Sequence, residues 1–286
     1  MIVFPNAKLN LGLHITEKRP DGFHNIETVF YPAHLCDALE MIPSEEKGVQ
    51  FTVSGLPLPG DPEENLVLKA VKLLSDTVTP RRDLRGVYPA ESRASRYPMP
   101  DTAVAFSGGV NIHLHKVIPP GSGLGGGSSD AAYALKLLND LWKLDLTNRE
   151  LQDLARRLGS DCAFFIENKP VLASGRGDRF EPLDLDLTGY RIEIMVPPVH
   201  VSTPEAYGMV TPRKPERLLR EVIQLPVREW KGNLVNDFEE PVMKKYPLIR
   251  EAKEELYHRG ALYASMSGSG SAVYGIFDTG CRMPDA

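Results

Sequence analysis

The chain has 286 residues, a formal net charge of −5 and 42% hydrophobic residues, which are ordinary values for a globular protein of one large or two smaller domains. The negative charge gives no bulk electrostatic reason to expect binding to nucleic acid or to a membrane surface. Three cysteines without a CxxC pair predict neither a disulfide framework nor a structural zinc site. No segment has the pattern of a signal peptide or the length of a membrane span, so we expect a cytoplasmic protein.

The amino-terminal part of the chain predicts strands and turns followed by one helix. Apolar residues alternate from Lys8 to Ile15, and two further strands are expected at residues 28–31 and 49–53. Residues 65–76 predict an amphipathic helix. Residues 77–109 hold several arginines and prolines without a sustained apolar pattern, which indicates a long surface insertion.

The middle of the chain predicts one strand and two helices. Residues 110–118 alternate as a strand does, and two prolines end it. Apolar residues then recur at steps of three and four from residue 131 to residue 142. Thr147 and Glu150 predict a capping box for the next helix, which we expect to stop at Gly159. This helix leads the chain directly to Asp161.

The carboxyl-terminal half predicts a second α+β unit. Strands are expected at residues 171–174, 192–196 and 272–277, and helices at residues 215–224, 234–246 and 247–259. There is no internal repeat. We expect a domain boundary near residues 165–180, with one domain at residues 1–170 and the other at residues 171–286.

The sequence PPGSGLGGGSSD, residues 119–130, is the most informative local pattern. Its five glycines stand directly before a predicted helix, and glycine lets the backbone adopt left-handed conformations in which successive N–H groups approach an anion. Two serines follow at the helix start, where unpaired amides attract phosphate and a hydroxyl can bind magnesium. A flexible linker or an elaborate helix cap is the alternative. The phosphate interpretation assigns Pro119, Pro120, Gly121, Ser122, Gly123, Leu124, Gly125, Gly126, Gly127, Ser128 and Ser129, with Ser129 also as a metal ligand.

The better-known phosphate loops do not match this turn. No lysine follows the glycines, so the pattern is not that of a P-loop. The spacing GxGxxG occurs, but a dinucleotide fold requires the helix to return to a parallel strand, and here a second helix follows. The partner motifs of the protein-kinase glycine loop are absent from the sequence.

Two further clusters carry polar residues that could serve the same site. Lys8 and Asn10 lie on the same side of the first predicted strand, for which a solvated polar face is the alternative. Asp161 precedes the apolar run CAFFI, where a carboxylate needs a partner, and Lys8 is a candidate. Residues 266–272, MSGSGSA, form a second turn of small residues that could be purely structural.

The chain resembles the GHMP kinases, which carry a lysine strand, a glycine-rich loop and a late glycine turn in this order. These motifs occur at residues 7–13, 119–132 and 265–273. The segments RPDGFH (19–24), NLVLKA (65–70) and LGSDCAFF (158–165) are similar to the branch that serves the non-mevalonate route to isoprenoid precursors. The resemblance implies an α+β, two-domain GHMP kinase fold with the active site in the cleft between the domains. The first domain would be ribosomal protein S5 domain 2-like and bind ATP, and the second would be a ferredoxin-like α/β domain shortened at its end.

The resemblance also implies roles for single residues. Asp161 would take the proton from the acceptor hydroxyl or orient it, and Lys8 would keep Asp161 ionised and offset charge on the transferred phosphoryl group. The implied donor is ATP with Mg²⁺, with Asn65 and Lys116 near the adenosine. The implied acceptor is a small molecule bearing a cytidine diphosphate, contacted by Asn10, Phe23, His24, Tyr207, Gly268 and Ser269.

Two other functions remain open. A sister kinase of the same family would act on homoserine, mevalonate or a sugar, but such an acceptor has no cytosine for Phe23 and His24 to hold. A non-enzymatic nucleotide-binding protein would not need both Lys8 and Asp161. Phe23 replaces the tyrosine that is commoner in the family, which keeps the stacking face and loses the hydroxyl. No nucleic acid or membrane partner is expected, and the chain is expected to be a monomer or a weak homodimer.

Overall fold

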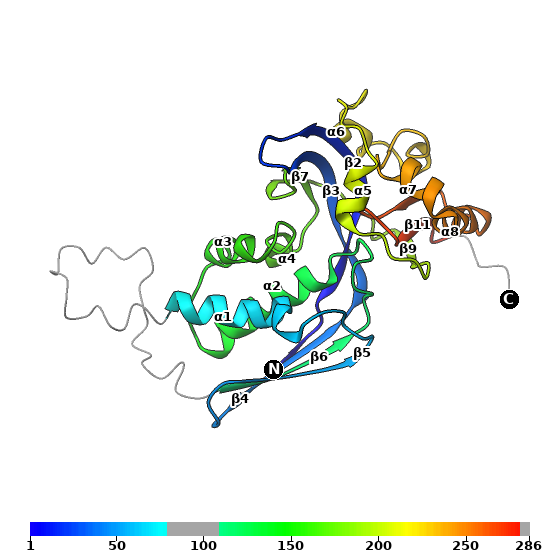
Figure 1. Ribbon diagram of the computed structural model, residues 1–286. Coiled ribbons are helices and arrows are strands. Elements are labelled where there is room, and N and C mark those ends of the chain that lie inside the picture. The colour runs from blue at the N-terminus through cyan, green and yellow to red at the C-terminus, as the bar shows by residue number, and fades with distance from the viewer. Residues whose placement is uncertain (79–108, 281–286) are drawn as a thin grey trace. The chain divides into compact units, whose positions relative to one another are not determined.

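The computed structural model describes residues 1–78 and 109–280, which form two compact units (Figure 1). The first unit comprises Met1–Pro5, Cys36–Val117 and Gly126–Glu167, and the second comprises Asn6–Leu35, Ile118–Gly125 and Asn168–Ala286, within the described ranges. The units are therefore built from interleaved segments of the chain. The division of the sequence at residue 170 stays a prediction. No described helix is long and apolar enough to cross a membrane.

The first unit is a four-stranded sheet covered by helices. The strands lie in the order β1 (Ile2–Val3), β4 (Ala38–Ser44), β6 (Gly109–Lys116) and β5 (Val49–Gly55). Strand β4 runs antiparallel to β6, whereas β5 runs parallel to it. Helices α1 (Leu66–Val78) and α2 (Gly126–Leu141) pack side by side over the sheet, with α3 (Asn148–Leu158) and α4 (Phe164–Glu167) against α2 (Figure 1).

Alternation along β6 builds the core of this unit. Val110, Ile112 and Leu114 are each at most 2% exposed, while His113 and His115 point to the other face of the sheet. Each fully buried aliphatic side chain of this kind contributes about 1.5–3 kcal/mol. The strand predicted at residues 110–118 is thereby confirmed.

A buried charged triad ties this sheet to helix α2. Lys116, at the end of β6, contacts a carboxylate oxygen of Asp130 at 2.7 Å and also bonds Asp37. The second oxygen of Asp37 accepts the N–H of Val117 at 2.6 Å. Burial, opposed by Lys116 and reinforced by Asp37, raises the pKa of Asp130 to about 7. One ammonium between two buried carboxylates cannot neutralise both, so Asp130 retains a proton more readily than an exposed aspartate does.

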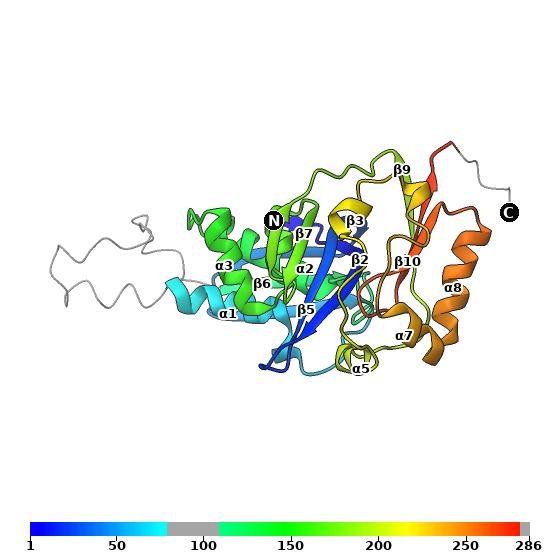
Figure 2. The same cartoon turned by 90° about the horizontal axis from the view of Figure 1, so that it is seen from above.

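The second unit contains two sheets. One has the order β2 (Asn6–Lys18), β3 (His24–Cys36), β7 (Val171–Gly175) and β8 (Arg179–Pro182), and the other has the order β10 (Tyr263–Met266), β11 (Val273–Asp278) and β9 (Tyr190–Met195). Helix α8 (Pro247–His258) packs against β10 and β11 (Figure 2). The shorter helices are α5 (Thr203–Gly208), α6 (Leu219–Val222) and α7 (Glu239–Lys245), and η1 (Pro62–Glu64) and η5 (Val227–Glu229) are 3-10 turns in the first and second unit.

Most elements lie where the sequence predicts them. Thr147 and Glu150 form the expected capping box, with the Thr147 N–H donating to the Glu150 carboxylate at 2.7 Å. The insertion predicted at residues 77–109 falls mainly on residues 79–108, outside the described residues. The sequence does not predict the strands β1, β4, β8 and β10 or the helices α4 and α5; apart from β4, each of these elements has at most six residues.

Two predicted helices are wrong in extent. The helix expected at residues 215–224 covers only Leu219–Val222, and the one expected at residues 234–246 begins at Glu239. The later start of the second helix is caused by a contact with a distant part of the chain. The segment around Asn236 pairs with β2 through Leu13, and its backbone cannot make helical bonds at the same time.

Candidate active site

The first half of the glycine-rich loop belongs to the second unit and has the backbone that the sequence predicts. Gly121, Gly123 and Gly125 have φ angles of 68°, 84° and 71°, a region that favours glycine. A Cβ atom at Gly123 would lie 2.1 Å from the carbonyl oxygen of Ser267, so a side chain is excluded there by contact as well. The hydroxyl of Ser122 donates to the carbonyl of Pro119 at 2.7 Å and closes the turn.

The second half of the loop opens helix α2 in the first unit. The helix begins at Gly126, so Ser128 and Ser129 lie in its first turn, where amide N–H groups lack helical partners. The hydroxyl of Ser129 is buried and has no hydrogen-bond partner among the described residues. A buried hydroxyl without a partner is unfavourable in a folded protein. The site therefore fits a phosphate that would accept a hydrogen bond from this hydroxyl, or a phosphate-bound magnesium ion that the hydroxyl oxygen would coordinate.

Lys8 and Asn10 are buried, at 4% and 2% exposed, so the alternative of a solvated polar strand face is wrong. The ammonium of Lys8 donates to Oδ1 of Asn10 at 2.5 Å and lies 4.5 Å from the centre of the Phe30 ring. The backbone N–H of Lys8 donates to the carbonyl of Leu124 at 2.8 Å. The lysine strand is thus bonded directly to the glycine-rich loop.

The late glycine turn completes this arrangement within the second unit. The hydroxyl of Ser267 accepts from the N–H of Asn10 at 3.2 Å and donates to the carbonyl of Gly123 at 3.0 Å. The N–H of Ala272 donates to the carbonyl of Ser122 at 2.9 Å. Gly268 is buried with a φ of 57°, and Ser269 is half-buried beside it. The structure therefore brings together three motifs that are far apart in the sequence.

Asp161 lies in the first unit, in the turn between α3 and α4. It is half-buried, and its carbonyl accepts the N–H of Phe164 at 3.2 Å. The neighbouring Cys162 is buried, and burial raises the pKa of its thiol to about 12, so this thiol stays protonated near neutral pH. The pairing of Asp161 with Lys8 stays a prediction.

The residues expected to hold a cytosine ring lie in the second unit. Phe23 is 55% exposed at the tip of the hairpin between β2 and β3, and the guanidinium of Arg176 lies 5.0 Å from its ring centre. The rings of His24 and Tyr207 are stacked, with centres 4.6 Å apart and an angle of 17°. Burial, with a contribution from Lys18, lowers the pKa of His24. A neutral imidazole can offer one donor and one acceptor to the edge of a base.

The two residues expected near adenosine lie in the first unit and have local structural roles. Asn65 caps helix α1, because its Oδ1 accepts the N–H of Val67 at 2.9 Å. The side chain of Lys116 is 1% exposed and is held by the buried carboxylates described above. Their contact with adenosine stays a prediction.

Sequence reasoning missed buried polar residues that support the site. Nδ2 of Asn10 donates to the hydroxyl of Thr28 at 3.0 Å, and the hydroxyl of Tyr274 donates to the carbonyl of Asn10 at 3.0 Å. The sequence predicts a helix at residues 234–246, which includes Asn236. The signal available for it was the sequence Asn-Asp before two glutamates, since asparagine and aspartate favour helix caps over helix interiors.

Comparison with known proteins shows the family to which the chain belongs. The family model of the GHMP kinases N terminal domain matches residues 65–169, and the model of the GHMP kinases C terminal domain matches residues 218–280. The chain belongs to the GHMP kinases and has their two-domain fold of mixed helices and strands.

The relatives carry one more specific name. A 4-diphosphocytidyl-2-C-methyl-D-erythritol kinase of Parabacteroides distasonis is 49% identical, over 97% of this chain and 92% of its own. The protein of that name from Bacteroides thetaiotaomicron is 49% identical over 100% of this chain and 95% of its own. A crystal structure of a 4-(cytidine 5'-diphospho)-2C-methyl-D-erythritol kinase has a TM-score of 0.74 and 31% identity, covering 96% of this chain and 90% of its own.

Proposed function

We propose that this chain is a 4-diphosphocytidyl-2-C-methyl-D-erythritol kinase, which transfers the γ-phosphoryl group of ATP to the 2-hydroxyl of its acceptor in non-mevalonate isoprenoid synthesis. The observation that carries the proposal is the hydrogen-bonded chain from Lys8 through Asn10 and Ser267 to Gly123. It joins the lysine strand to the phosphate loop and the late glycine turn. The near full-length similarity to kinases of this name supports the choice of acceptor.

The transfer needs a base, a cation and a cradle for phosphate. The carboxylate of Asp161 takes the proton of the acceptor hydroxyl, whose oxygen forms a bond to the γ-phosphorus while the bond to the leaving ADP oxygen breaks. The buried ammonium of Lys8 offsets negative charge on the transferred group. The amides of the glycine-rich loop and of the first turn of α2 hold the phosphates of ATP.

Magnesium fits the same region through Ser129. Within the described residues, no group of three or more His, Cys, Asp or Glu side chains is placed to hold a metal ion. Magnesium often keeps substrate phosphates and water among its ligands, so one hydroxyl such as that of Ser129 is a suitable protein contribution. When bound, the ion would neutralise charge between the phosphates.

The cytidine end of the acceptor is read by aromatic and polar groups. The exposed ring of Phe23 offers a stacking face, and His24 and Tyr207 offer polar edges from a stacked pair. Asn10, on the strand, and Gly268 and Ser269, in the late turn, bind the acceptor as well, and Asn10 helps to position it. We further propose that the protein acts in the cytoplasm as a monomer or a weak homodimer, without nucleic acid or membrane partners.

One turnover assay tests the function directly. The purified chain is incubated with ATP, Mg²⁺ and 4-diphosphocytidyl-2-C-methyl-D-erythritol, and ADP release is measured against parallel reactions with homoserine, mevalonate and galactose. ADP release with the cytidine-bearing acceptor, inhibited competitively by CMP, is the expected result. ADP release with another acceptor and no effect of CMP would identify a sister kinase instead. No ADP release with any acceptor would favour a nucleotide-binding protein.

A further inference from the structure

The backbone around Asn236 is fixed to the strand that carries the lysine motif. The N–H of Leu13 donates to the carbonyl of Val235 at 2.9 Å, and the N–H of Asp237 donates to the carbonyl of Leu13 at 2.9 Å. These two bonds form an isolated parallel bridge between Leu13 and Asn236. Asn236 therefore has a fixed position relative to strand β2.

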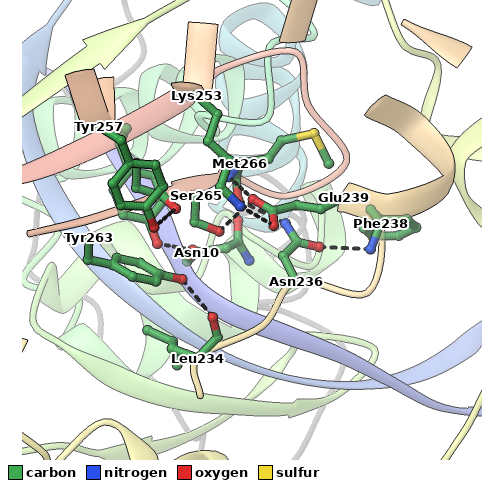
Figure 3. Close-up of polar contacts among 12 residues, drawn as sticks. Asn10, Leu234, Asn236, Phe238, Glu239, Lys253, Tyr257, Tyr263, Ser265 and Met266 are labelled. Atoms are coloured by element: carbon green, nitrogen blue, oxygen red, sulfur yellow. Dashed lines mark hydrogen bonds and ion pairs between the residues drawn. The ribbon is translucent and has the colours of Figure 1, made fainter. Parts of the chain in front are cut away.

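The side chain of Asn236 reaches in the other direction, to the late glycine turn. It is 1% exposed, and its Nδ2 donates to the carbonyls of Met266 at 2.8 Å and Gly268 at 2.9 Å. Its Oδ1 accepts the N–H of Phe238 at 3.0 Å, and this bond is drawn in Figure 3. Both amide hydrogens and the oxygen are used, which fixes the orientation of the amide group.

Glu239, the residue directly after Phe238 and the first of α7, holds the adjacent part of the late glycine turn. One oxygen of its carboxylate accepts the N–H of Met266 at 2.7 Å and the hydroxyl of Ser265 at 3.0 Å (Figure 3). The other oxygen accepts from Lys253 at 2.7 Å. Asn236 is distinguished from Glu239 because its two donors bond the two carbonyls on either side of Ser267.

Ser267 is the residue that connects this turn to the lysine strand. Its hydroxyl accepts from the N–H of Asn10 and donates to the carbonyl of Gly123, as described above. Asn10 in turn accepts from the ammonium of Lys8. A shift of the two carbonyls that Asn236 holds would therefore move the Ser267 hydroxyl and, through Asn10, the ammonium.

We infer that Asn236 is a positioning residue for phosphoryl transfer, which fixes the turn around Ser267 and thereby the place of the Lys8 ammonium. The inference rests on the proposed catalytic role of Lys8. Transfer rates are sensitive to such placement, since a displacement of about 1 Å can reduce a rate about 100-fold. The side-chain amide of Asn236 bonds the backbone of Met266, Gly268 and Phe238, so its loss reduces the rate through the position of other groups.

The test uses Asn236→Asp, which keeps the shape of the side chain. A carboxylate cannot donate to either carbonyl, whereas a protonated carboxyl can donate to one of them. Burial beside carbonyl oxygens raises the pKa of the new carboxyl. At about pH 8 we expect kcat to fall about 10- to 100-fold with both KM values within about threefold of the wild type. The deficit relative to the wild type shrinks as the pH is lowered.

The matched control is Asn233→Asp on the same segment. Asn233 donates to the carbonyl of Glu229 at 2.7 Å and lies outside the network around Ser267. We expect its kcat to stay within about twofold of the wild type at every pH, as for most surface substitutions. A control that loses rate to the same extent and with the same pH dependence would overturn the inference.

A second variant covers the case in which Asn236→Asp does not fold. Ser267→Ala removes the connecting hydroxyl, so it also lowers kcat, and when both variants fold their effects on kcat are less than additive because both act through one turn. Wild-type kcat for Ser267→Ala or for folded Asn236→Asp, or additive effects in the double variant, overturns the positioning role. A wild-type chain that does not turn over the cytidine acceptor overturns the proposed function instead.

Discussion

The carbonyl oxygen of Ser267 occupies the space where Gly123 would carry a side chain, at 2.1 Å from the position of a Cβ atom. The φ of Gly123 is also 84°. The contact and the backbone angle both require glycine, because a non-glycine residue in the left-handed region costs about 1–2 kcal/mol before any clash is counted. Glycine at position 123 therefore permits both the conformation of the glycine-rich loop and its close approach to the late glycine turn.

We expect Gly123→Ala to lower the free energy of unfolding by at least about 1–2 kcal/mol and to reduce kcat more than about tenfold. Chemical denaturation and initial rates measure the two effects. Gly189→Ala in the same unit is the control, because a Cβ there meets no heavy atom within 4 Å. An unchanged rate in Gly123→Ala would contradict the role given to the loop.

Asp161→Asn tests the base. The amide cannot accept the proton of the acceptor hydroxyl, so kcat should fall about 10²- to 10⁴-fold while the KM for ATP changes little. The control is Asp153→Asn on α3, which removes an exposed carboxylate that pairs with Arg156 at 2.9 Å. Its expected kcat is within about twofold of the wild type. Near-normal turnover by Asp161→Asn would contradict the role of Asp161 as the base.

Asp130→Asn should change how stability depends on pH. The pKa of Asp130 is about 7 in the folded chain and 3.8 as the ordinary value, so the folded state binds the proton more tightly. The contribution of this bound proton to the free energy of unfolding is fully present below about pH 4 and is lost as the pH rises through about 7. As the pH rises between these values, the free energy of unfolding of the wild type should fall by on the order of 1–4 kcal/mol relative to that of Asp130→Asn.

Denaturant titrations of both proteins at acidic and mildly alkaline pH measure this difference. Other titrating groups cancel, because they are shared by the wild type and the variant. Asp140→Asn, at an exposed position of α2, is the matched control for removal of a carboxylate from the same helix. A difference between the wild type and Asp130→Asn that stays constant over this pH range would mean that folding does not raise the pKa of Asp130.

Phe23→Ala tests recognition of the cytosine ring. Loss of an aromatic stacking face is worth about 1–3 kcal/mol per base, so the KM for the acceptor should rise about 5- to 150-fold while the KM for ATP is unchanged. Inhibition by CMP should weaken in parallel. Phe4→Ala, which removes another exposed ring that is 64% accessible, is the control and should leave both KM values unchanged. An acceptor KM that stays the same in Phe23→Ala would remove this residue from the acceptor site.

Features that depend on local chemistry are predictable from the amino-acid sequence alone. Alternation placed β6, the Thr147–Glu150 box placed the start of α3, and the run of glycines before a periodic helix indicated phosphate binding. These signals suffice because backbone angles, caps and burial patterns are set by residues that are neighbours in the chain. The order of the three motifs further identified the family.

The contacts of the polar residues between these features depend on long-range packing in the folded chain. Local sequence favoured a helix through Asn236, but pairing with Leu13 withdrew its backbone from the helix. Lys8 could have lain on a solvated face, and long-range packing buried it instead. Ser267, Asn10 and Gly123 are separated by more than 100 residues from one another along the chain, so their hydrogen bonds exist only after folding has brought the turns together. Local patterns carry no information about such contacts.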